Sequence, residues 1–278
     1  MRAFRVAYDG TPYYGYQRQP DVPTVEDTIF DGLRDLDVLS QDADSPAGYA
    51  AAGRTDAGVS ATCQTIALEA PDWLTPRAFS GALPPSIQVW ASAEAPDDFH
   101  ATHHATRREY TYHLYAPPAG GANEFAEAVD DDRFAAALEA LSGPADFHNF
   151  TPDDHNTERA PDLSATRDGD YLVVTVTAGG FARELVRRLV SLAHAIGVGD
   201  EPLEKVDRAL SPEALPGHEG IAPAPPEPLV LTHVEYPELS FDVDEVAVSS
   251  ARELFEADRL ERRTGARISR TLRDGLRE

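Results

Sequence analysis

The sequence predicts an α+β fold whose two halves follow the same order of elements: strand, helix, strand, strand, helix, strand. Strand-like segments with alternating apolar residues and helix-like segments with apolar residues three or four positions apart follow one another in this order twice. The length of 278 residues also suits two domains of ordinary size. The repeat lies in the order of elements alone, because the residues of the two halves do not repeat.

The first half opens with a β-rich alternating segment at residues 2–8, and a loop rich in glycine, proline and tyrosine follows at 9–20. Thr24 and Asp27 resemble a capping box, and apolar residues at helical spacing come after them, namely Ile29, Phe30, Leu33 and Leu36. The remaining elements are two short strands, a short helix that ends before a Pro-Pro pair, and a strand, at residues 48–52, 61–68, 75–83 and 87–93.

The second half opens with a strand at residues 107–115, and a helix with one apolar face follows at 131–141. The Asp168-Gly169 pair is a strong turn signal and predicts a hairpin. The two hairpin strands, a second helix and a last strand lie at residues 163–167, 171–177, 181–196 and 229–235. Residues 199–228 are rich in proline and glutamate with little periodicity, and they predict a long exposed loop.

Two βαββαβ units predict two ferredoxin-like domains that lie side by side with joined antiparallel sheets and a central cleft. We expect the first domain at residues 1–104, the second at 105–240 and an Arg-rich C-terminal extension at 241–278. Residues 259–278 contain seven arginines and three acidic residues, a net charge of +4, so the other 258 residues carry −28. We expect this basic stretch to be helical.

The composition is strongly acidic. Acidic residues number 48 against 24 basic residues, and Lys205 is the only lysine. An acidic surface with arginine in place of lysine indicates adaptation to a salt-rich cytoplasm. At molar salt the Debye length is about 3 Å, so the net charge of −24 does not exclude a polyanionic partner.

The sequence also excludes several classes of protein. No window approaches the ~20 consecutive apolar residues of a membrane span, and no signal peptide is visible at the N-terminus. Cys63 is the single cysteine, which excludes an internal disulfide and a Cys-rich zinc site. The chain also lacks a P-loop and a G-x-G-x-x-G motif for a nucleotide cofactor. We therefore expect a soluble cytoplasmic protein.

The stretch around Asp56 carries the chemically informative residues. Gly53 and Gly58 allow a sharp turn and the close approach of another molecule. Arg54 lies two residues from Asp56 and can hold the carboxylate ionised by charge pairing. An ionised aspartate in such a loop can act as a nucleophile or a general base. The residues alone modestly favour an ordinary Asp-Gly-type loop.

This stretch, G-R-T-D-A-G at residues 53–58, resembles the signature of the TruA family of tRNA pseudouridine synthases. Further segments resemble the family's motifs in the same order, among them Y-D-G at the start of residues 8–19 and R-x-Y-x-Y within residues 98–112. The others lie at residues 146–150, 181–188 and 229–237. The resemblance spans about residues 4–237, and one six-residue match is more easily a coincidence than an ordered set of six motifs.

The resemblance implies a role for individual residues. Asp56 matches the catalytic aspartate, which attacks the uridine either at the ribose C1′ or at the base C6. Tyr110 matches the tyrosine that stacks on the uracil, and Arg187 matches the arginine that pairs with the catalytic carboxylate. Arg54 is expected to contact the RNA backbone. Further possible RNA contacts are Arg18, Arg107 and Arg183, and Arg183 lies one helical turn before Arg187 in the expected helix.

The resemblance also implies the substrate and the partners. The substrate is tRNA, with uridines of the anticodon stem-loop around positions 38–40 as targets, and the enzyme is a homodimer. The isomerisation needs no metal, nucleotide or redox cofactor. A stacked uridine must be flipped out at a cost of a few kcal/mol, which an aromatic ring partly offsets by stacking worth about 1–3 kcal/mol. The basic stretch at 259–277 is equally well interpreted as a solvated helix or as an RNA contact.

Four positions depart from the family's pattern. Ser60 stands where a histidine is common, Arg188 replaces an asparagine, Glu109 replaces a basic residue beside Tyr110, and residues 225–228 are proline-rich. These departures affect positioning rather than the reaction itself. Glu184, four residues before Arg188, predicts a surface ion pair with it.

Other readings of the sequence are weaker. His100, His103 and His104 could suggest a metal site, but on a loop-to-strand stretch their side chains would diverge and no carboxylate or cysteine completes the set. A phosphatase would need a second aspartate beside Asp56, and an aspartic protease would need two D-[ST]-G elements. The remaining alternative is a non-catalytic tRNA-binding module that uses the same cleft.

Overall fold

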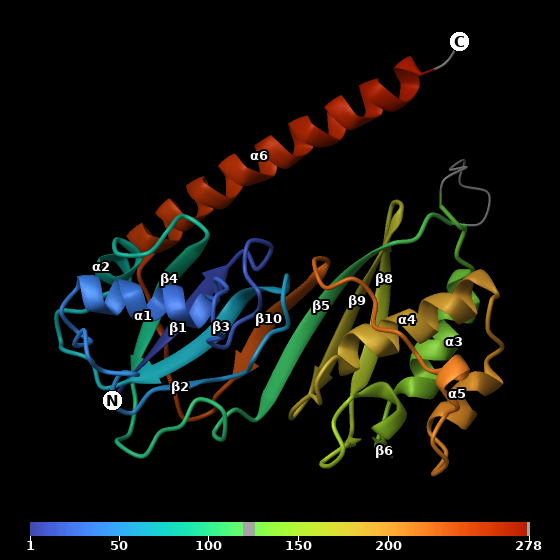
Figure 1. Ribbon diagram of the computed structural model, residues 1–278, viewed down its shortest axis with the longest axis horizontal. Coiled ribbons are helices and arrows are strands. Elements are labelled where there is room, and N and C mark those ends of the chain that lie inside the picture. Colours follow the sequence, from blue (N-terminus) through green and yellow to red (C-terminus); the bar gives the residue numbers. More distant parts are fainter. Residues whose placement is uncertain (119–125, 277–278) are drawn as a thin grey trace.

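The computed structural model describes residues 1–118 and 126–276. A large, mainly antiparallel sheet forms its centre, with the strand order β11-β4-β1-β3-β10-β5-β9-β8 and with β2 paired to β3 (Figure 1). The strands of this sheet are β1 (Arg2–Tyr8), β2 (Ala50–Ala51), β3 (Ser60–Leu68), β4 (Ile87–Glu94), β5 (Arg107–Tyr115), β8 (Asp162–Asp168), β9 (Tyr171–Ala178), β10 (Leu229–Glu235) and β11 (Asp242–Val243). A separate small sheet pairs β6 (Ala145–Asp146) with β7 (Glu158–Arg159).

The two halves of the chain place their strands in the same spatial order. The spatial order is β4-β1-β3-β2 in the first half and β10-β5-β9-β8 in the second. When the four strands of each half are numbered by their order in the sequence, both spatial orders read fourth, first, third, second. The halves join through β3 and β10, which pair in parallel over Ser60 with Val230 and Ala61 with Leu231. The expectation of joined antiparallel sheets therefore needs correction at the join, because β3 and β10 run in the same direction.

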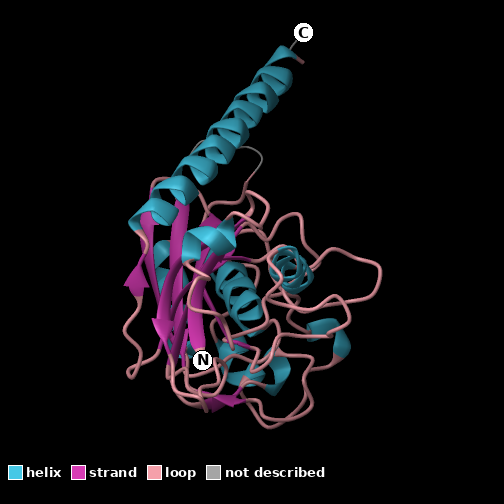
Figure 2. Cartoon of the chain, turned by 90° about the vertical axis from the view of Figure 1, so that its left-hand side faces the viewer, coloured by secondary structure: helices cyan, strands magenta, loops and turns pink. Residues whose placement is uncertain are grey.

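The helices of the two halves gather on one side of the sheet, and the last helix extends away from the body (Figure 2). They are α1 (Val25–Asp35), α2 (Pro76–Ser80), α3 (Asp131–Leu141), α4 (Leu185–Val198), α5 (Glu204–Ala209) and α6 (Glu245–Gly275), with short 3₁₀ turns η1 (His148–Phe150) and η2 (Gly217–Glu219). The predicted capping box is present, because the Thr24 side chain accepts a hydrogen bond from the Asp27 amide at 3.2 Å. Asp130 caps α3 in the same way.

The core lies between this side of the sheet and the helices that cover it. Residues 3–8 of β1 are buried without interruption, as expected for a strand inside a large sheet. In α1 the apolar positions predicted from helical spacing, Ile29, Phe30 and Leu33, are buried, and Phe4 meets Phe79 edge to face at 5.5 Å. The core therefore fixes the loops at the ends of β1 and β3, where the conspicuous motifs lie.

Two expectations about the second half were wrong. The helix expected at 181–196 begins at Leu185, because Glu184 adopts a left-handed backbone with φ of 62° that the helix cannot contain. The segment 199–228, expected as a long loop, contains α5 and η2. Val206 and Ala209 of α5 are buried, so this segment contributes to the core.

The C-terminal extension adds to the sheet before it becomes helical. Its strand β11 pairs with β4 through Asp242 and Val243, and α6 begins directly afterwards with Asp244 as its N-cap. The expected helix of the basic stretch is present from its start to Gly275, while Arg277 and Glu278 lie outside the described residues. In the part of the chain that the structure describes, no helix has the length and apolar character needed to cross a bilayer.

Candidate functional site

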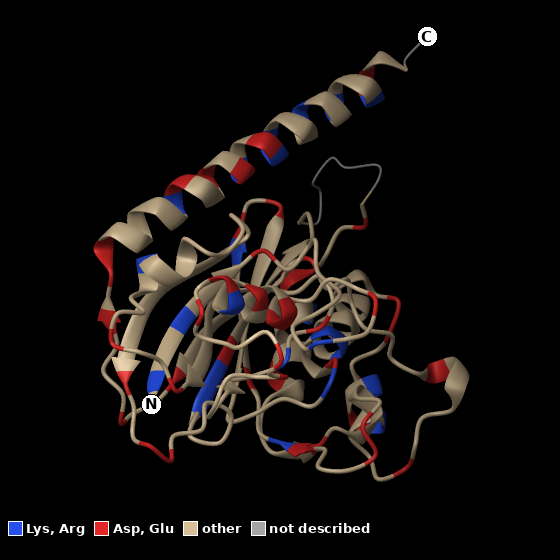
Figure 3. Ribbon diagram, turned by 60° about the vertical axis from the view of Figure 1, so that its left-hand side comes forward, with Lys and Arg blue, Asp and Glu red and all other residues tan. Residues whose placement is uncertain are grey.

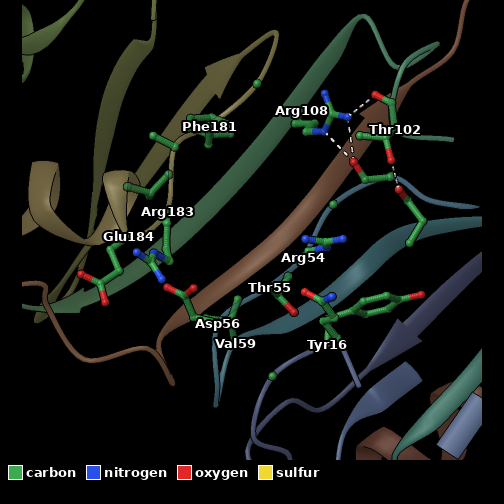
Figure 4. Close-up of a pocket in the computed structure, with 18 of the residues that line it drawn as sticks. Tyr16, Arg54, Thr55, Asp56, Val59, Thr102, Arg108, Phe181, Arg183 and Glu184 are labelled. Carbon is green, nitrogen blue, oxygen red and sulfur yellow. Dashed lines mark hydrogen bonds between the residues drawn. The ribbon is translucent and has the colours of Figure 1, made fainter. Parts of the chain in front are cut away.

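A cleft of about 1430 Å³ opens on the helix-bearing side of the sheet, between the two halves of the chain (Figure 4). The first half contributes residues 14–17, Gln19 and the segment 49–57, which includes most of the G-R-T-D-A-G stretch. The second half contributes residues 180–187, which precede and begin α4, together with Pro226 and Leu229. The cleft therefore brings together sequence segments that are more than a hundred residues apart.

Asp56 is held in the cleft by a loop that is tied to the tyrosine-rich segment after β1. The Thr55 carbonyl accepts a hydrogen bond from the Tyr16 amide at 3.0 Å, and the Thr55 hydroxyl lies 2.8 Å from the buried Tyr8 hydroxyl. Gly58 has a φ of 82°, which a side chain would strain, and its amide donates to the Tyr13 carbonyl at 3.2 Å. These contacts fix the direction in which the Asp56 carboxylate points.

The partner of the Asp56 carboxylate is Arg187, which reaches it from α4 in the facing half. Arg187 Nη1 lies 3.0 Å from Asp56 Oδ2, and Arg187 Nε donates to the Ala224 carbonyl at 2.7 Å. The Arg187 side chain is 13 % exposed and that of Asp56 is 28 % exposed, so the pair is partly shielded from water. The expectation that Arg54 pairs with Asp56 was wrong, because the facing wall supplies the cation instead.

Tyr110 forms an aromatic wall of the cleft. It comes from β5, is 8 % exposed, and meets Phe181 edge to face at a ring distance of 5.2 Å. Burial raises the pKa of Tyr110 to about 12, so the phenol stays protonated at neutral pH. Phe181 can occupy this place because it precedes α4 instead of lying on it (Figure 4).

The arginines expected to contact RNA divide into two groups. Arg54 and Arg183 line the cleft, whereas Arg18 and Arg107 are absent from its lining in the described chain. The Arg18 side chain lies 2.6 Å from Asp27, and Arg107 donates to Thr177 at 3.2 Å.

The two arginines in the cleft differ in their contacts. Arg183 precedes α4, so it does not share a helical face with Arg187 as expected, and its side chain lies 3.5 Å from Asp153. Within the described residues, no hydrogen bond or ion pair holds the Arg54 side chain, which is exposed. Arg54 is therefore available to a ligand.

Arg108 is a functional residue that the sequence reasoning missed. It is 8 % exposed and donates to the Ala52 carbonyl at 2.7 and 3.0 Å, to Thr102 at 2.7 Å and to Gly179 at 2.6 Å (Figure 4). It thus ties the residue before the Asp56 stretch to the residues before Phe181. Burial lowers the pKa of its guanidinium. The signal was present, since Arg108 is the arginine of the R-x-Y-x-Y motif.

The histidines at the far end of the cleft do not form a metal site in the described part of the chain, where no group of three or more metal-binding side chains occurs. The rings of His100 and His103 lie 4.2 Å apart, and Nδ1 of His100 accepts a hydrogen bond from the Thr102 amide at 3.2 Å. Burial, with the neighbouring His103 as a further cause, lowers the pKa of His100. Both rings border the cleft.

Two departures from the expected motifs have a structural explanation. Ser60 accepts a hydrogen bond from the Gly10 amide at 3.0 Å, which ties the start of β3 to the end of β1. The Pro-rich segment 225–228 lies against the cleft, and the Pro225 carbonyl accepts a hydrogen bond from the Tyr112 hydroxyl at 2.9 Å. The expected pair of Glu184 and Arg188 is present at 2.5 Å, although both side chains are about one-quarter exposed or less.

Comparisons with known proteins show the family of the chain. A tRNA pseudouridine synthase A from Haloarcula marismortui is 57 % identical to the chain over 99 % of its length and 100 % of the relative. The chain belongs to the tRNA pseudouridine synthase A (TruA) family. A second tRNA pseudouridine synthase A, from Natronomonas pharaonis, is 52 % identical over 98 % of both chains. The family model described as tRNA pseudouridine synthase matches residues 137–237.

Membership of the TruA family makes the chain an isomerase. Its relatives in halophilic archaea agree with the acidic, lysine-poor composition. A chain from the solved "Structure of H/ACA RNP bound to a substrate RNA containing 2'-deoxyuridine" is 16 % identical with a TM-score of 0.36, over 70 % of this chain and 44 % of that one. This likeness is too low to add to the argument.

Proposed function

We propose that this TruA-family protein isomerises uridine to pseudouridine in the anticodon stem-loop of tRNA, around positions 38–40, with Asp56 as the nucleophile. The observation that carries the proposal is the pairing of Asp56 with Arg187 across the cleft at 3.0 Å. The pairing places a carboxylate, held by one half of the chain, beside a cation held by the other, in a cleft that also presents Tyr110. The tRNA substrate is supported by the names of the relatives.

The residues of the cleft suit the steps of this reaction. Asp56 attacks C1′ or C6, the N1–C1′ glycosidic bond breaks, and the uracil rotates so that C5 bonds to C1′. The C5 hydrogen then leaves as a proton, N1 takes up a proton, and the bond to Asp56 breaks, so the product is an isomer of the substrate. Arg187 holds the Asp56 carboxylate in position in the cleft through their 3.0 Å contact. Tyr110 offers an aromatic surface to the flipped base, and such stacking, worth about 1–3 kcal/mol, offsets part of the cost of unstacking.

Arg54 suits contact with the RNA. Its guanidinium is exposed on the Asp56 loop and has no internal hydrogen bond or ion pair in the described chain. An arginine in this state can donate two parallel hydrogen bonds to a phosphate. Arg54 lies two residues from the proposed nucleophile. It is therefore placed to bind the RNA backbone next to the flipped nucleotide, or to fill the space that the flipped base leaves.

The proposal extends to the domains and the assembly. The strand order of each half, fourth, first, third, second, supports two ferredoxin-like domains at residues 1–104 and 105–240, followed by the extension at 241–278. We propose a homodimer in the cytoplasm by analogy with the family. The two halves meet at the cleft, so both domains are needed to complete the site.

The deciding experiment is the substitution Asp56→Ala, assayed by tritium release from tRNA that carries [5-³H]uridine. We expect release to fall to background while tRNA binding stays within about threefold of the wild type. Asp153→Ala is the matched control, because Asp153 is also a cleft aspartate paired with an arginine but lies on the other wall. Unchanged release by Asp56→Ala would remove Asp56 from the mechanism.

The same experiment separates the enzyme from a non-catalytic tRNA-binding module. If the wild-type protein binds tRNA and releases no tritium from any tRNA of its own organism, the binding-module reading replaces the enzyme. Mapping of pseudouridine in tRNA from a strain that lacks the protein identifies the modified positions. Retention of pseudouridine at positions 38–40 in that strain would contradict the proposed target.

A further inference from the structure

The end of α6, with its cap Leu276, forms a helical arm of 18 residues, 259–276, that buries none of them against the described chain. Every residue of the arm is exposed, whereas Ala247 and Ala251 near the start of α6 are buried. The helix leaves the body after these contacts and its C-terminal end lies away from it (Figure 1). An isolated helix of this length is only marginally stable in water. Because no residue of the arm is buried, packing against its own chain does not explain why the arm is helical.

The arm is anchored beside the loop that supports the catalytic aspartate. Arg262 forms an ion pair with Asp9, which directly follows β1. The next residue, Gly10, donates its amide to Ser60 at 3.0 Å, and Ser60 begins β3 just after the Asp56 loop. The first turn of the arm is therefore linked by these contacts to the start of β3, next to the Asp56 loop.

The arginines of the arm share one face. With about 100° between successive residues of an α-helix, the six described arginines fall within an arc of about 140°. They are Arg259, Arg262, Arg263, Arg267, Arg270 and Arg273. Figure 3 shows basic residues repeating along α6, whereas acidic residues are common over the body. Charge is thus concentrated on one side of the arm in a chain whose net charge is −24.

Three of these arginines form no hydrogen bond or ion pair in the described chain, although Arg263 also interacts electrostatically with Glu256. Arg259 pairs with Glu256 and Arg273 with Asp274, at 2.6 and 2.8 Å. No hydrogen bond or ion pair within residues 1–118 and 126–276 involves the side chains of Arg263, Arg267 and Arg270, which lie on one half of the arc. These three lie at positions i, i+4 and i+7, so their Cα atoms span about 10 Å along one face.

We propose that this arginine face binds the phosphate backbone of the RNA substrate outside the cleft. The inference rests on the proposed function for the identity of the RNA as tRNA. Unpaired guanidinium groups in a row complement a polyanion, and a guanidinium can engage a phosphate with two parallel hydrogen bonds. Such direct contacts persist when molar salt screens the acidic body, because the Debye length is then about 3 Å.

A second copy of the chain is the other occupant to consider, since the opposite side of the arm carries Ile268, Leu272 and Leu276, each more than half exposed. A helix pair needs apolar residues at every a and d position of its seam. In the heptad frame that includes Leu254, Ile268 and Leu272, the other seam positions are Asp258, Glu261, Gly265 and Gly275. Two acidic residues and two glycines at these positions disfavour a stable helix pair. The arginine face is therefore the side of the arm that is better suited to bind a partner.

The test replaces the three unpaired arginines together, as Arg263→Gln, Arg267→Gln and Arg270→Gln, in the full chain. Glutamine keeps the helix propensity and removes three charges. The charge-matched control replaces three body arginines that do not line the cleft, as Arg34→Gln, Arg133→Gln and Arg208→Gln. A triple Arg→Lys variant of the arm keeps the charge and removes the forked donors.

Binding of full-length tRNA is measured from 0.2 M to 2 M KCl, together with KM and kcat for tritium release. We expect the arm variant to raise Kd about tenfold at 0.2 M and to lower the slope of log Kd against log salt by about 2 to 3, because each lost phosphate contact removes about 0.7–0.9. The loss should appear in KM more than in kcat. The lysine variant should restore most of the slope.

Two outcomes would overturn the proposal. One is an unchanged salt slope in the arm variant, and the other is an equal loss in the body control. If the arm variant binds tRNA normally while Leu272→Gln converts a sedimenting dimer to a monomer, the arm serves a second copy instead. Failure of the proposed function is separate, since it shows as absent tritium release from the wild type whatever the arm does.

Discussion

Replacement of Arg187 by lysine tests whether the geometry of the guanidinium, and not only its charge, aligns Asp56. Arg187 serves two acceptors with different nitrogens: Nη1 lies 3.0 Å from Asp56 Oδ2, and Nε lies 2.7 Å from the Ala224 carbonyl oxygen. A lysine carries a single ammonium at the end of a flexible stem, so it cannot reproduce both contacts in this arrangement. Arg187→Lys therefore keeps the charge and loses one hydrogen bond and the fixed direction.

The size of the effect follows from the lost hydrogen bond. A hydrogen bond to a charged group is worth about 1.5–3 kcal/mol, and each ~1.4 kcal/mol corresponds to a factor of ten. If the bond aligns the carboxylate for attack, kcat/KM for tritium release falls by about 10- to 150-fold. The fold itself should persist, since the substitution leaves a cation beside Asp56.

Arg188→Lys is the matched control on the same helix. Arg188 also binds a carboxylate with its forked donors, that of Glu184, but it does not touch Asp56. We expect this control to keep kcat/KM within about threefold of the wild type, and circular dichroism and thermal unfolding should show both variants folded. Equal activity of the Arg187→Lys and Arg188→Lys variants would refute the reasoning.

A double-mutant cycle isolates the pair from other effects. Asp56→Asn, Arg187→Gln and the double substitution are compared by the free energy of unfolding in denaturant. Because both side chains are less than one-third exposed, we expect a coupling energy of about 1–2 kcal/mol. A coupling near zero would show that the 3.0 Å contact does not form in solution.

Three further predictions concern the frame of the site. Gly10→Ala should lower the free energy of unfolding by at least about 2 kcal/mol in denaturant titrations, since an added Cβ would lie 2.0 Å from the Val59 carbonyl oxygen; wild-type stability would contradict the packing. Arg108→Leu should lower it by about 2–5 kcal/mol, because buried carbonyls from both halves lose their donor, while Arg107→Leu, on the same strand, should change it far less. Above pH 10 the free energy of unfolding should fall with rising pH, because tyrosines of the unfolded chain then lose protons that the buried tyrosines keep up to about pH 12. Each buried tyrosine contributes up to about 1.4 kcal/mol per pH unit. An unfolding temperature that stays constant between pH 10 and 12 would refute this expectation. These tyrosines are Tyr110, Tyr112 and Tyr236.

Local patterns predicted the elements of the fold well where short-range physics decides them. The strands β5 and β10 and the helix α3 have the predicted bounds, because alternation, helical spacing and a capping aspartate act within a few residues. The start of α4 could not be read from spacing, because the apolar spacing continues upstream through Phe181. The left-handed Glu184 interrupts the helix, and Phe181 gains a contact with Tyr110 instead. Tertiary packing therefore overrode a valid local pattern.

The site shows the same division. The signature stretch singled out Asp56 through its resemblance to the family motif, but the arginine that pairs with Asp56 comes from a position 131 residues away, which no local spacing reveals. Arg54 was nearer in sequence and was the wrong partner. The R-x-Y-x-Y motif contains Arg108, but its four hydrogen bonds all go to backbone carbonyls, and side-chain patterns do not identify such partners. Only the resemblance to a family supplied the Arg187 assignment from sequence.

The charge of the cleft explains how an acidic chain can hold RNA. The lining contains five arginines and four acidic residues, so the cleft is cationic by one charge while the whole chain carries −24. Two of the acids, Asp56 and Asp153, already face arginines within the cleft, and Glu184 faces Arg188. The acidic excess that suits a salt-rich solvent therefore lies outside the cleft, and compensation inside it leaves Arg54 free for phosphate. Different residues of the same chain therefore make the surface acidic and supply the cations that suit a polyanion.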